Sequence, residues 1–106
     1  MKIKPWGTEQ ILEQNEFYVL KRLVMKKGHS CSLQYHEKKK ETIYVLSGIL
    51  EIEINGNKKV YKVNSFVTIF PNEIHRMKAI STSKYLEAST NYLEDVVRLE
   101  DDYGRV

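Results

Sequence analysis

The stretch Leu50-Glu51-Ile52-Glu53-Ile54-Asn55-Gly56 decides the fold class of this chain. Its first five residues place three apolar side chains on one face and two glutamates on the other, which is the period of two that a β-strand produces. Asn55-Gly56 then supplies the strongest short-range signal for a β-hairpin turn. A second run with strand character, Lys59 to Val63, follows it. The segment therefore predicts two antiparallel strands joined by a tight turn.

Short runs of the same kind continue on both sides of this hairpin. They cover Phe17 to Met25, Ser30 to His36, Thr42 to Leu46, Phe66 to Phe70, His75 to Ile80 and Tyr85 to Ser89. Many short strands with tight turns, and no convincing helical pattern longer than two turns, are typical of an all-β sandwich or barrel. The chain ends are expected to be short non-strand segments, and a short helix is one option for the tail, Tyr92 to Val106.

Length and composition describe an ordinary globular protein. The 106 residues suit one compact domain, 1–106, and the formal net charge is only +3. No apolar run approaches the ~20 residues of a membrane span, and the start of the chain does not resemble a signal peptide. We therefore expect a cytoplasmic protein with no membrane partner.

A single cysteine, Cys31, excludes an internal disulfide and a multi-cysteine metal site. No aromatic and basic stripe marks a nucleic-acid surface.

Four side chains with metal-binding chemistry stand at suitable positions. Gln34 and His36 are two residues apart in an expected strand, so both leave the same face. Glu41 opens the next strand, and His75 follows a Pro-Asn turn later in the chain. In a small antiparallel barrel these four could converge on one interior point. Imidazole, carboxylate and amide oxygen suit Zn, Mn, Fe, Co or Ni, and such a site leaves coordination positions open for water or substrate.

Two motifs in the middle of the chain resemble those of the cupin superfamily. They read Gly28-x5-Gln34-x-His36-x4-Glu41-x6-Gly48 and Asn64-x5-Phe70-Pro71-Asn72-x2-His75. Further segments resemble the type II phosphomannose isomerase cupins in a standalone form. They are Lys4-Pro5-Trp6-Gly7, Pro71-x3-His75-Arg76 and Val97-Arg98-x2-Asp101-x-Tyr103-Gly104-Arg105.

This resemblance implies a double-stranded β-helix, the jelly-roll-like cupin barrel, commonly as a homodimer. It implies one divalent metal ion on Gln34, His36, Glu41 and His75, with zinc first among the candidates. It also implies an aldose–ketose isomerase for mannose 6-phosphate and fructose 6-phosphate, acting through an enediolate in nucleotide-sugar and polysaccharide biosynthesis. A partner subunit could dock on the apolar outer face of Leu33 and Tyr35.

An isomerase of this kind needs a base for the carbon proton and cations for the phosphate. Lys21 is the candidate base, because it can point into the barrel from the strand face opposite to that of Leu20 and Arg22. The candidate substrate-binding cations are Lys4, Lys39, Arg76, Arg98 and Arg105.

Two other functions fit the same residues. One is an epimerase or isomerase acting on another phosphosugar or on a nucleotide sugar. The other is a non-catalytic sugar-binding or regulatory cupin, which the lack of an obvious base favours. Spacing alone chooses neither the metal nor the sugar.

Overall fold

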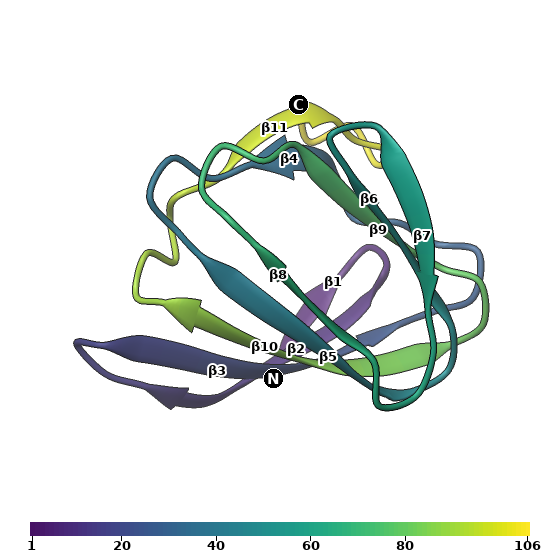
Figure 1. Cartoon of the computed structure of the whole chain (residues 1–106), viewed down its shortest axis with the longest axis horizontal. Coiled ribbons are helices and arrows are strands. Elements are labelled where there is room, and N and C mark those ends of the chain that lie inside the picture. The colour runs from purple at the N-terminus through teal and green to yellow at the C-terminus, as the bar shows by residue number, and fades with distance from the viewer.

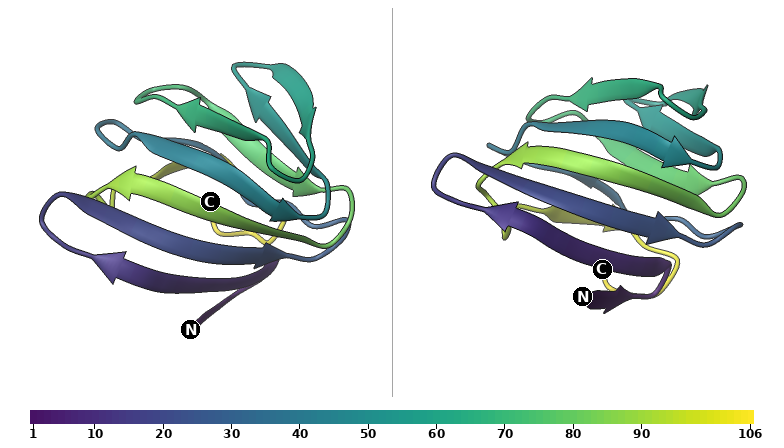
Figure 2. Two further views of the ribbon diagram at one scale, coloured as in Figure 1. Left: turned by 60° about the horizontal axis from the view of Figure 1, so that its bottom comes forward. Right: turned by 90° about the horizontal axis from the view of Figure 1, so that it is seen from below.

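The computed structural model describes residues 1–106 as eleven β-strands without a helix, arranged in two antiparallel sheets that face each other (Figure 1, Figure 2). The large sheet contains, in spatial order, β1 (Lys2–Lys4), β2 (Gly7–Gln14), β3 (Tyr18–Met25), β10 (Ser83–Thr90), β5 (Glu41–Ser47) and β8 (Phe66–Ile69). The small sheet contains β11 (Val97–Glu100), β4 (Leu33–Tyr35), β9 (His75–Ala79), β6 (Leu50–Ile54) and β7 (Asn57–Tyr61). The all-β prediction is confirmed, and no helix that could cross a membrane is present.

The hairpin that decides the fold class forms as the sequence predicts. Strands β6 and β7 pair with Ile54 opposite Asn57, so Asn55 and Gly56 are the only residues in the turn. Both have positive φ, 49° and 83°, which is the requirement of a type I′ turn and the reason that Asn-Gly is favoured there.

The expectation of non-strand chain ends is wrong. β1 pairs with β2 at one edge of the large sheet, and β11 pairs with β4 at one edge of the small sheet. No helix forms in the tail, Tyr92 to Val106. The four residues of β11 are half-buried or exposed, and so short an edge strand leaves little hydrophobic pattern to read.

Strand β2 was also absent from the sequence prediction, although its eight residues pair along most of β3. Its inward residues include Glu9, which is buried, and its far end is exposed. A charged side chain on the inner face removes the alternation that marks a half-buried strand.

The interior between the sheets is divided along the strands into an apolar part and a charged part. On β3 the inward residues are Lys21, Leu23 and Met25. On the antiparallel strand β10, Glu87 lies opposite Lys21, Tyr85 opposite Leu23 and Ser83 opposite Met25. The apolar part holds thirteen buried residues, among them Leu23 and Tyr85. Each fully buried apolar side chain contributes about 1.5–3 kcal/mol, so this part stabilises the fold while the charged part is free for chemistry.

Candidate metal centre

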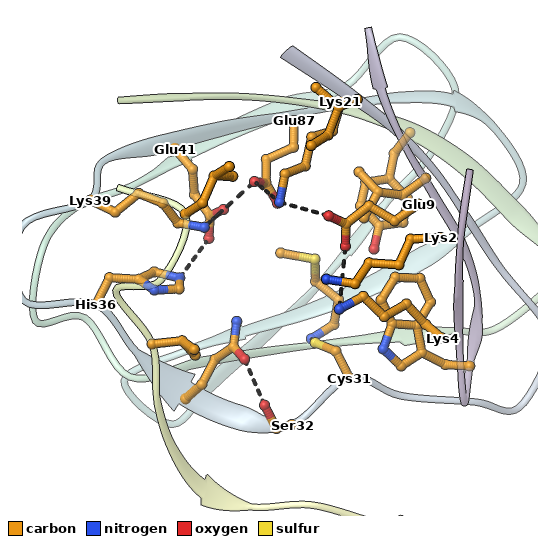
Figure 3. A pocket seen from close by; sticks show the side chains of 18 of the residues that line it. Lys2, Lys4, Glu9, Lys21, Cys31, Ser32, His36, Lys39, Glu41 and Glu87 are labelled. Carbon is orange, nitrogen blue, oxygen red and sulfur yellow. Dashed lines mark hydrogen bonds and ion pairs between the residues drawn. The ribbon is translucent and has the colours of Figure 1, made fainter. Parts of the chain in front are cut away.

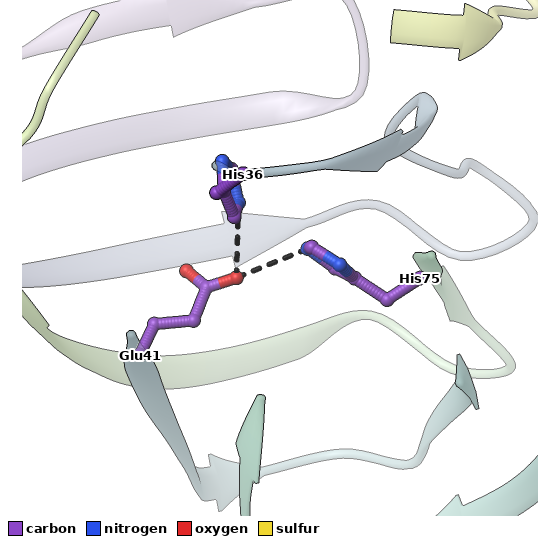
Figure 4. Close-up of side chains that lie close together, drawn as sticks. All are labelled: His36, Glu41 and His75. Atoms are coloured by element: carbon purple, nitrogen blue, oxygen red, sulfur yellow. Dashed lines mark ion pairs between the residues drawn. The ribbon is translucent and has the colours of Figure 1, made fainter. Parts of the chain in front are cut away.

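Three buried side chains converge at the charged part of the interior (Figure 4). His36 follows β4, Glu41 begins β5 and His75 begins β9. Oε1 of Glu41 lies 3.1 Å from Nε2 of His75 and 3.4 Å from Nε2 of His36. One ligand atom from each of the three residues lies within 4.8 Å of the others, so the group could hold a metal ion.

The outer nitrogens of the two rings show which atoms face the centre. Nδ1 of His36 donates to the backbone carbonyl of Asp95 at 2.5 Å, and Nδ1 of His75 donates to that of Glu73 at 2.9 Å. A carbonyl can only accept, so each Nδ1 carries hydrogen and each Nε2 of a neutral ring carries a lone pair. Both Nε2 atoms and Oε1 of Glu41 are buried without a hydrogen-bond partner. A cation would satisfy all three, and these residues therefore fit a divalent metal.

The same arrangement shifts the pKa values in the metal-free protein. Burial acts to lower the pKa of His75, but the hydrogen bond and charge of Glu41 outweigh it and raise that pKa above its ordinary value. Burial acts to raise the pKa of Glu41, but the hydrogen bonds that His36 and His75 can donate once an Nε2 takes up a proton, and the charge of Lys39, hold it well below the ordinary range. The centre thus favours one positive charge beside Glu41, supplied by a proton or by a metal.

Gln34, the fourth expected ligand, lies beside this group. It is directly opposite His75 in the pairing of β4 with β9, and it lines the same cavity as His36 and Glu41. Its Oε1 accepts a hydrogen bond from the Ser32 hydroxyl at 2.6 Å. The amide is therefore held at the wall of the centre by a residue that directly precedes β4.

A cavity of about 640 Å³ opens from the centre between the two sheets. Alternating charges cross its large-sheet side in one connected series, which we call the charge ladder (Figure 3). Its members are Lys4, Glu9, Lys21, Glu87, Lys39 and Glu41. The shortest contact joins Lys21 Nζ to Glu9 Oε1 at 2.9 Å, and the others lie between 3.6 and 3.9 Å.

The part of the ladder next to the centre is the most deeply buried. Burial, and then the negative charge of Glu41, raises the pKa of Glu87 to about 7. Burial acts to lower the pKa of Lys39, but the carboxylates of Glu87 and Glu41 raise it. A carboxyl group that can change its protonation state near neutral pH thus lies beside a lysine that stays charged.

The cations expected to bind substrate divide into two groups. Lys4, Lys39, Arg98 and Arg105 line the cavity. Arg76 does not: its Nε donates to the Cys31 carbonyl at 2.9 Å, and its Nη2 forms an ion pair with Asp102 at 3.0 Å. Arg105 is held by both carboxylate oxygens of Asp101. Lys21, the expected base, lines the cavity as an ammonium between two carboxylates.

Sequence reasoning missed Glu9, Glu87 and Lys2, which also line this cavity. Glu87 carried a signal, because it shares the inward face of its strand with Tyr85 and Ser89. Glu9 lies in the unpredicted strand β2, and Lys2 in the unpredicted strand β1. Neither carried a signal that period-two reasoning could detect.

Solved structures with the same architecture are cupins and double-stranded β-helix proteins. KdgF from a Halomonas species matches with a TM-score of 0.80 at 16% identity, over 87% of this chain and 84% of that chain. An RmlC-like cupin from Shewanella frigidimarina matches with a TM-score of 0.79 at 16% identity, over 88% and 83%. At this level of identity the likeness shows the fold alone, and it confirms the cupin prediction.

The sequence comparisons reach further. Residues 2–101 match the family model described as mannose-6-phosphate isomerase C-terminal. A mannose-1-phosphate guanylyltransferase, ManC, from Salmonella typhimurium is 34% identical over 97% of this chain, and one from Escherichia coli K12 is 32% identical over 97%. The xanthan biosynthesis protein XanB of Xanthomonas campestris is 31% identical over 96%. This chain spans less than a quarter of the length of these relatives, 22% to 23%. The chain belongs to the family of mannose-6-phosphate isomerase C-terminal domains, and its fold is that of a cupin.

Proposed function

We propose that this protein is a metal-dependent sugar-phosphate isomerase that interconverts mannose 6-phosphate and fructose 6-phosphate or a closely related aldose–ketose pair. The observation that carries the proposal is the convergence of three unpartnered acceptor atoms, from His36, Glu41 and His75, at a cavity that is rich in cations. Membership of the family named for mannose-6-phosphate isomerase supports the substrate class.

The metal would be held by His36, Glu41 and His75, with Gln34 beside them. When bound, a divalent ion supplies a Lewis acid that offsets negative charge on reacting oxygen atoms. Asp95 and Glu73 fix the two imidazole rings through their backbone carbonyls, so that the lone pairs stay aimed at the centre.

The charge ladder supplies the remaining groups. Aldose–ketose interconversion moves a proton between neighbouring carbons, and this requires an acceptor within hydrogen-bond reach of the substrate. Lys21 as an ammonium has no free electron pair, so its part is to donate hydrogen bonds to substrate hydroxyls. The proton acceptor would be a carboxylate of the charge ladder. Glu87 is the candidate, because Lys39 forms ion pairs with both Glu87 and the metal-centre residue Glu41.

Proton NMR in deuterated water tests the proposal. Metal-loaded protein is incubated with mannose 6-phosphate or fructose 6-phosphate, and exchange is followed at C1 and C2. We expect exchange together with interconversion. The variant His36→Ala should lose both. His29→Ala should keep them, because it removes an imidazole that hydrogen-bonds Tyr103 of the tail and does not line the cavity. Absence of exchange with Zn, Mn, Fe, Co and Ni each supplied would contradict the proposal and favour a sugar-binding cupin.

A further inference from the structure

The side chains that line the cavity carry an excess of positive charge. Six are cations, namely Lys2, Lys4, Lys21, Lys39, Arg98 and Arg105, and four are carboxylates, namely Glu9, Glu41, Glu87 and Glu94. An excess of this size matches the charge of a phosphomonoester, which is ≈ −1.5 to −2 near pH 7. Only cations that are not already paired with a carboxylate are free to bind it.

Most of the six are already paired with carboxylates. Lys4, Lys21 and Lys39 belong to the charge ladder, and Arg105 is held by Asp101. Lys2 and Arg98 form no ion pair. Nε of Arg98 is buried and has no hydrogen-bond partner. A buried guanidinium N–H without an acceptor is costly unless a ligand completes it.

The position of Arg98 relates it directly to the metal centre. Arg98 is opposite Gln34 in the pairing of β11 with β4, and Gln34 is opposite His75 in the pairing of β4 with β9. Residues directly opposite each other point to the same face of a sheet. Since neighbouring strands lie ≈ 4.8 Å apart, the backbones of Arg98 and His75 are separated by roughly 10 Å. Arg98 therefore lies on the same inner face, two strands away from the centre.

Lys2 lines the same cavity from the other sheet. It comes from the edge strand β1 of the large sheet, whereas Arg98 comes from the edge strand β11 of the small sheet. Figure 3 shows Lys2 and Lys4 side by side, both pointing into the pocket, on the side away from His36 and Glu41. A guanidinium fork and an ammonium together provide geometric fit and charge for phosphate oxygens.

We infer that Lys2 and Arg98 form the phosphate subsite of this cavity. The inference rests on the proposed function for the identity of the ligand as a sugar phosphate. It fixes the orientation of that ligand: the phosphate lies between the two edge strands, the hydroxyl groups lie along the charge ladder, and the reacting carbons lie at His36, Glu41 and His75.

The test measures binding of inorganic phosphate to the full chain by titration calorimetry. The protein is first freed of metal with a chelator, so that phosphate cannot bind to a metal ion instead. Hydrogen bonds to charged groups contribute about 1.5–3 kcal/mol, so Arg98→Met should weaken binding at least tenfold. Lys2→Met should weaken it several-fold, and Arg98→Lys should restore part of the loss. Far-UV circular dichroism of each variant checks that it is folded.

Two charge-matched controls accompany these variants. Lys58→Met and Lys84→Met each remove one exposed positive charge on β7 or β10 that does not line the cavity, and both should bind phosphate within about twofold of the original protein. The inference is overturned if metal-free protein does not bind phosphate, or if folded Arg98→Met binds it equally well.

The outcome can be separated from that of the proposed function. If the metal-loaded protein does not isomerise sugar phosphates but phosphate binding follows the variants as expected, the proposed function fails and the subsite stands. If isomerisation occurs and Arg98→Met leaves the KM for fructose 6-phosphate unchanged, the subsite fails and the isomerase stands.

Discussion

Glu41 is the residue on which the candidate metal centre depends. Its Oε1 faces the Nε2 atoms of both His36 and His75, and its Oε2 faces the ammonium of Lys39 at 3.7 Å. With no metal bound and both rings neutral, Oε1 and the two ring lone pairs repel one another in a buried site where water does not screen them. The ionised carboxylate therefore favours metal binding, but it destabilises the metal-free protein when both rings are neutral.

The variant Glu41→Gln should affect metal affinity and metal-free stability differently. Its amide can donate to an Nε2 lone pair, so at a pH where both rings are neutral we expect the metal-free variant to melt at a temperature equal to or above that of the original protein. Metal affinity should fall by about 100-fold or more, since loss of groups that merely support a ligand already costs 10–100-fold. The rise in melting temperature on adding zinc, which follows from binding to the folded state, should disappear. Thermal unfolding with and without zinc measures both effects. Glu51→Gln, on the solvent side of β6, is the control, and a zinc-dependent rise in Glu41→Gln would contradict the prediction.

At the residue scale, the sequence predicted the centre better than its surroundings. The spacing of His36, Glu41 and His75 could be compared with cupin motifs, because metal ligands are restricted to few residue types. Glu9 and Lys2 could not be found in this way. An ion pair such as Lys21 with Glu9 depends on which strands become neighbours, and that information is not contained in either local segment.

At the element scale, the segment from residue 92 to residue 96 holds the loop that carries His36. The Asp95 carboxylate accepts hydrogen bonds from three consecutive backbone N–H groups, those of Glu37, Lys38 and Lys39, at 2.7–3.0 Å. The Asp95 carbonyl accepts the hydrogen bond from Nδ1 of His36. One residue of the tail thus fixes both the backbone of the loop and the ring of the histidine.

We expect Asp95→Ala to loosen this loop. Loss of the charged acceptor should lower the free energy of unfolding by about 1–3 kcal/mol, and poorer orientation of His36 should lower metal affinity about tenfold. Chemical denaturation and zinc titration measure the two quantities. Asp102→Ala is the matched control, because it removes a tail carboxylate that contacts Arg76 instead. Unchanged zinc affinity in Asp95→Ala would show that the loop holds His36 without this clamp.

The elements themselves were predictable where a strand has one apolar face. β6 and β7 follow from alternation and from Asn55-Gly56. β1, β2 and β11 were missed because their inward faces contribute to a charged cavity or are too short to show a pattern. Because inward side chains of these strands are charged and line the cavity, an analysis of hydrophobic periodicity does not detect the strands.

At the scale of the whole molecule, the tail completes the wall of the cavity. Tyr103 packs against the apolar core, and Arg105 lines the cavity while its guanidinium is held by Asp101. The hydrogen bond from Arg105 lowers the pKa of Asp101 to about 2. The ionised carboxylate of Asp101 therefore stabilises the conformation of the tail between residues 101 and 105.

This dependence predicts a pH-sensitive contribution to stability. Because the pKa is lowered in the folded state, the stabilisation is fully present above the ordinary carboxyl range near pH 4 and is lost as the pH falls towards about 2. Melting temperatures of the original protein and of Asp101→Asn should differ at pH 5 to 7 and should converge near pH 2. A difference that stays constant across this range would contradict the prediction.

The centre also joins the two sheets at the end of the interior opposite to the apolar core. His75 belongs to the small sheet, His36 directly follows strand β4 of that sheet, and Glu41 belongs to the large sheet. A cation held by all three would therefore be a cross-link between the two halves of the sandwich. With Cys31 as its only cysteine, the chain has no internal covalent bridge of this kind. The two sheets could not separate before the cation was released, so the ion would prolong the lifetime of the folded state as well as supply chemistry.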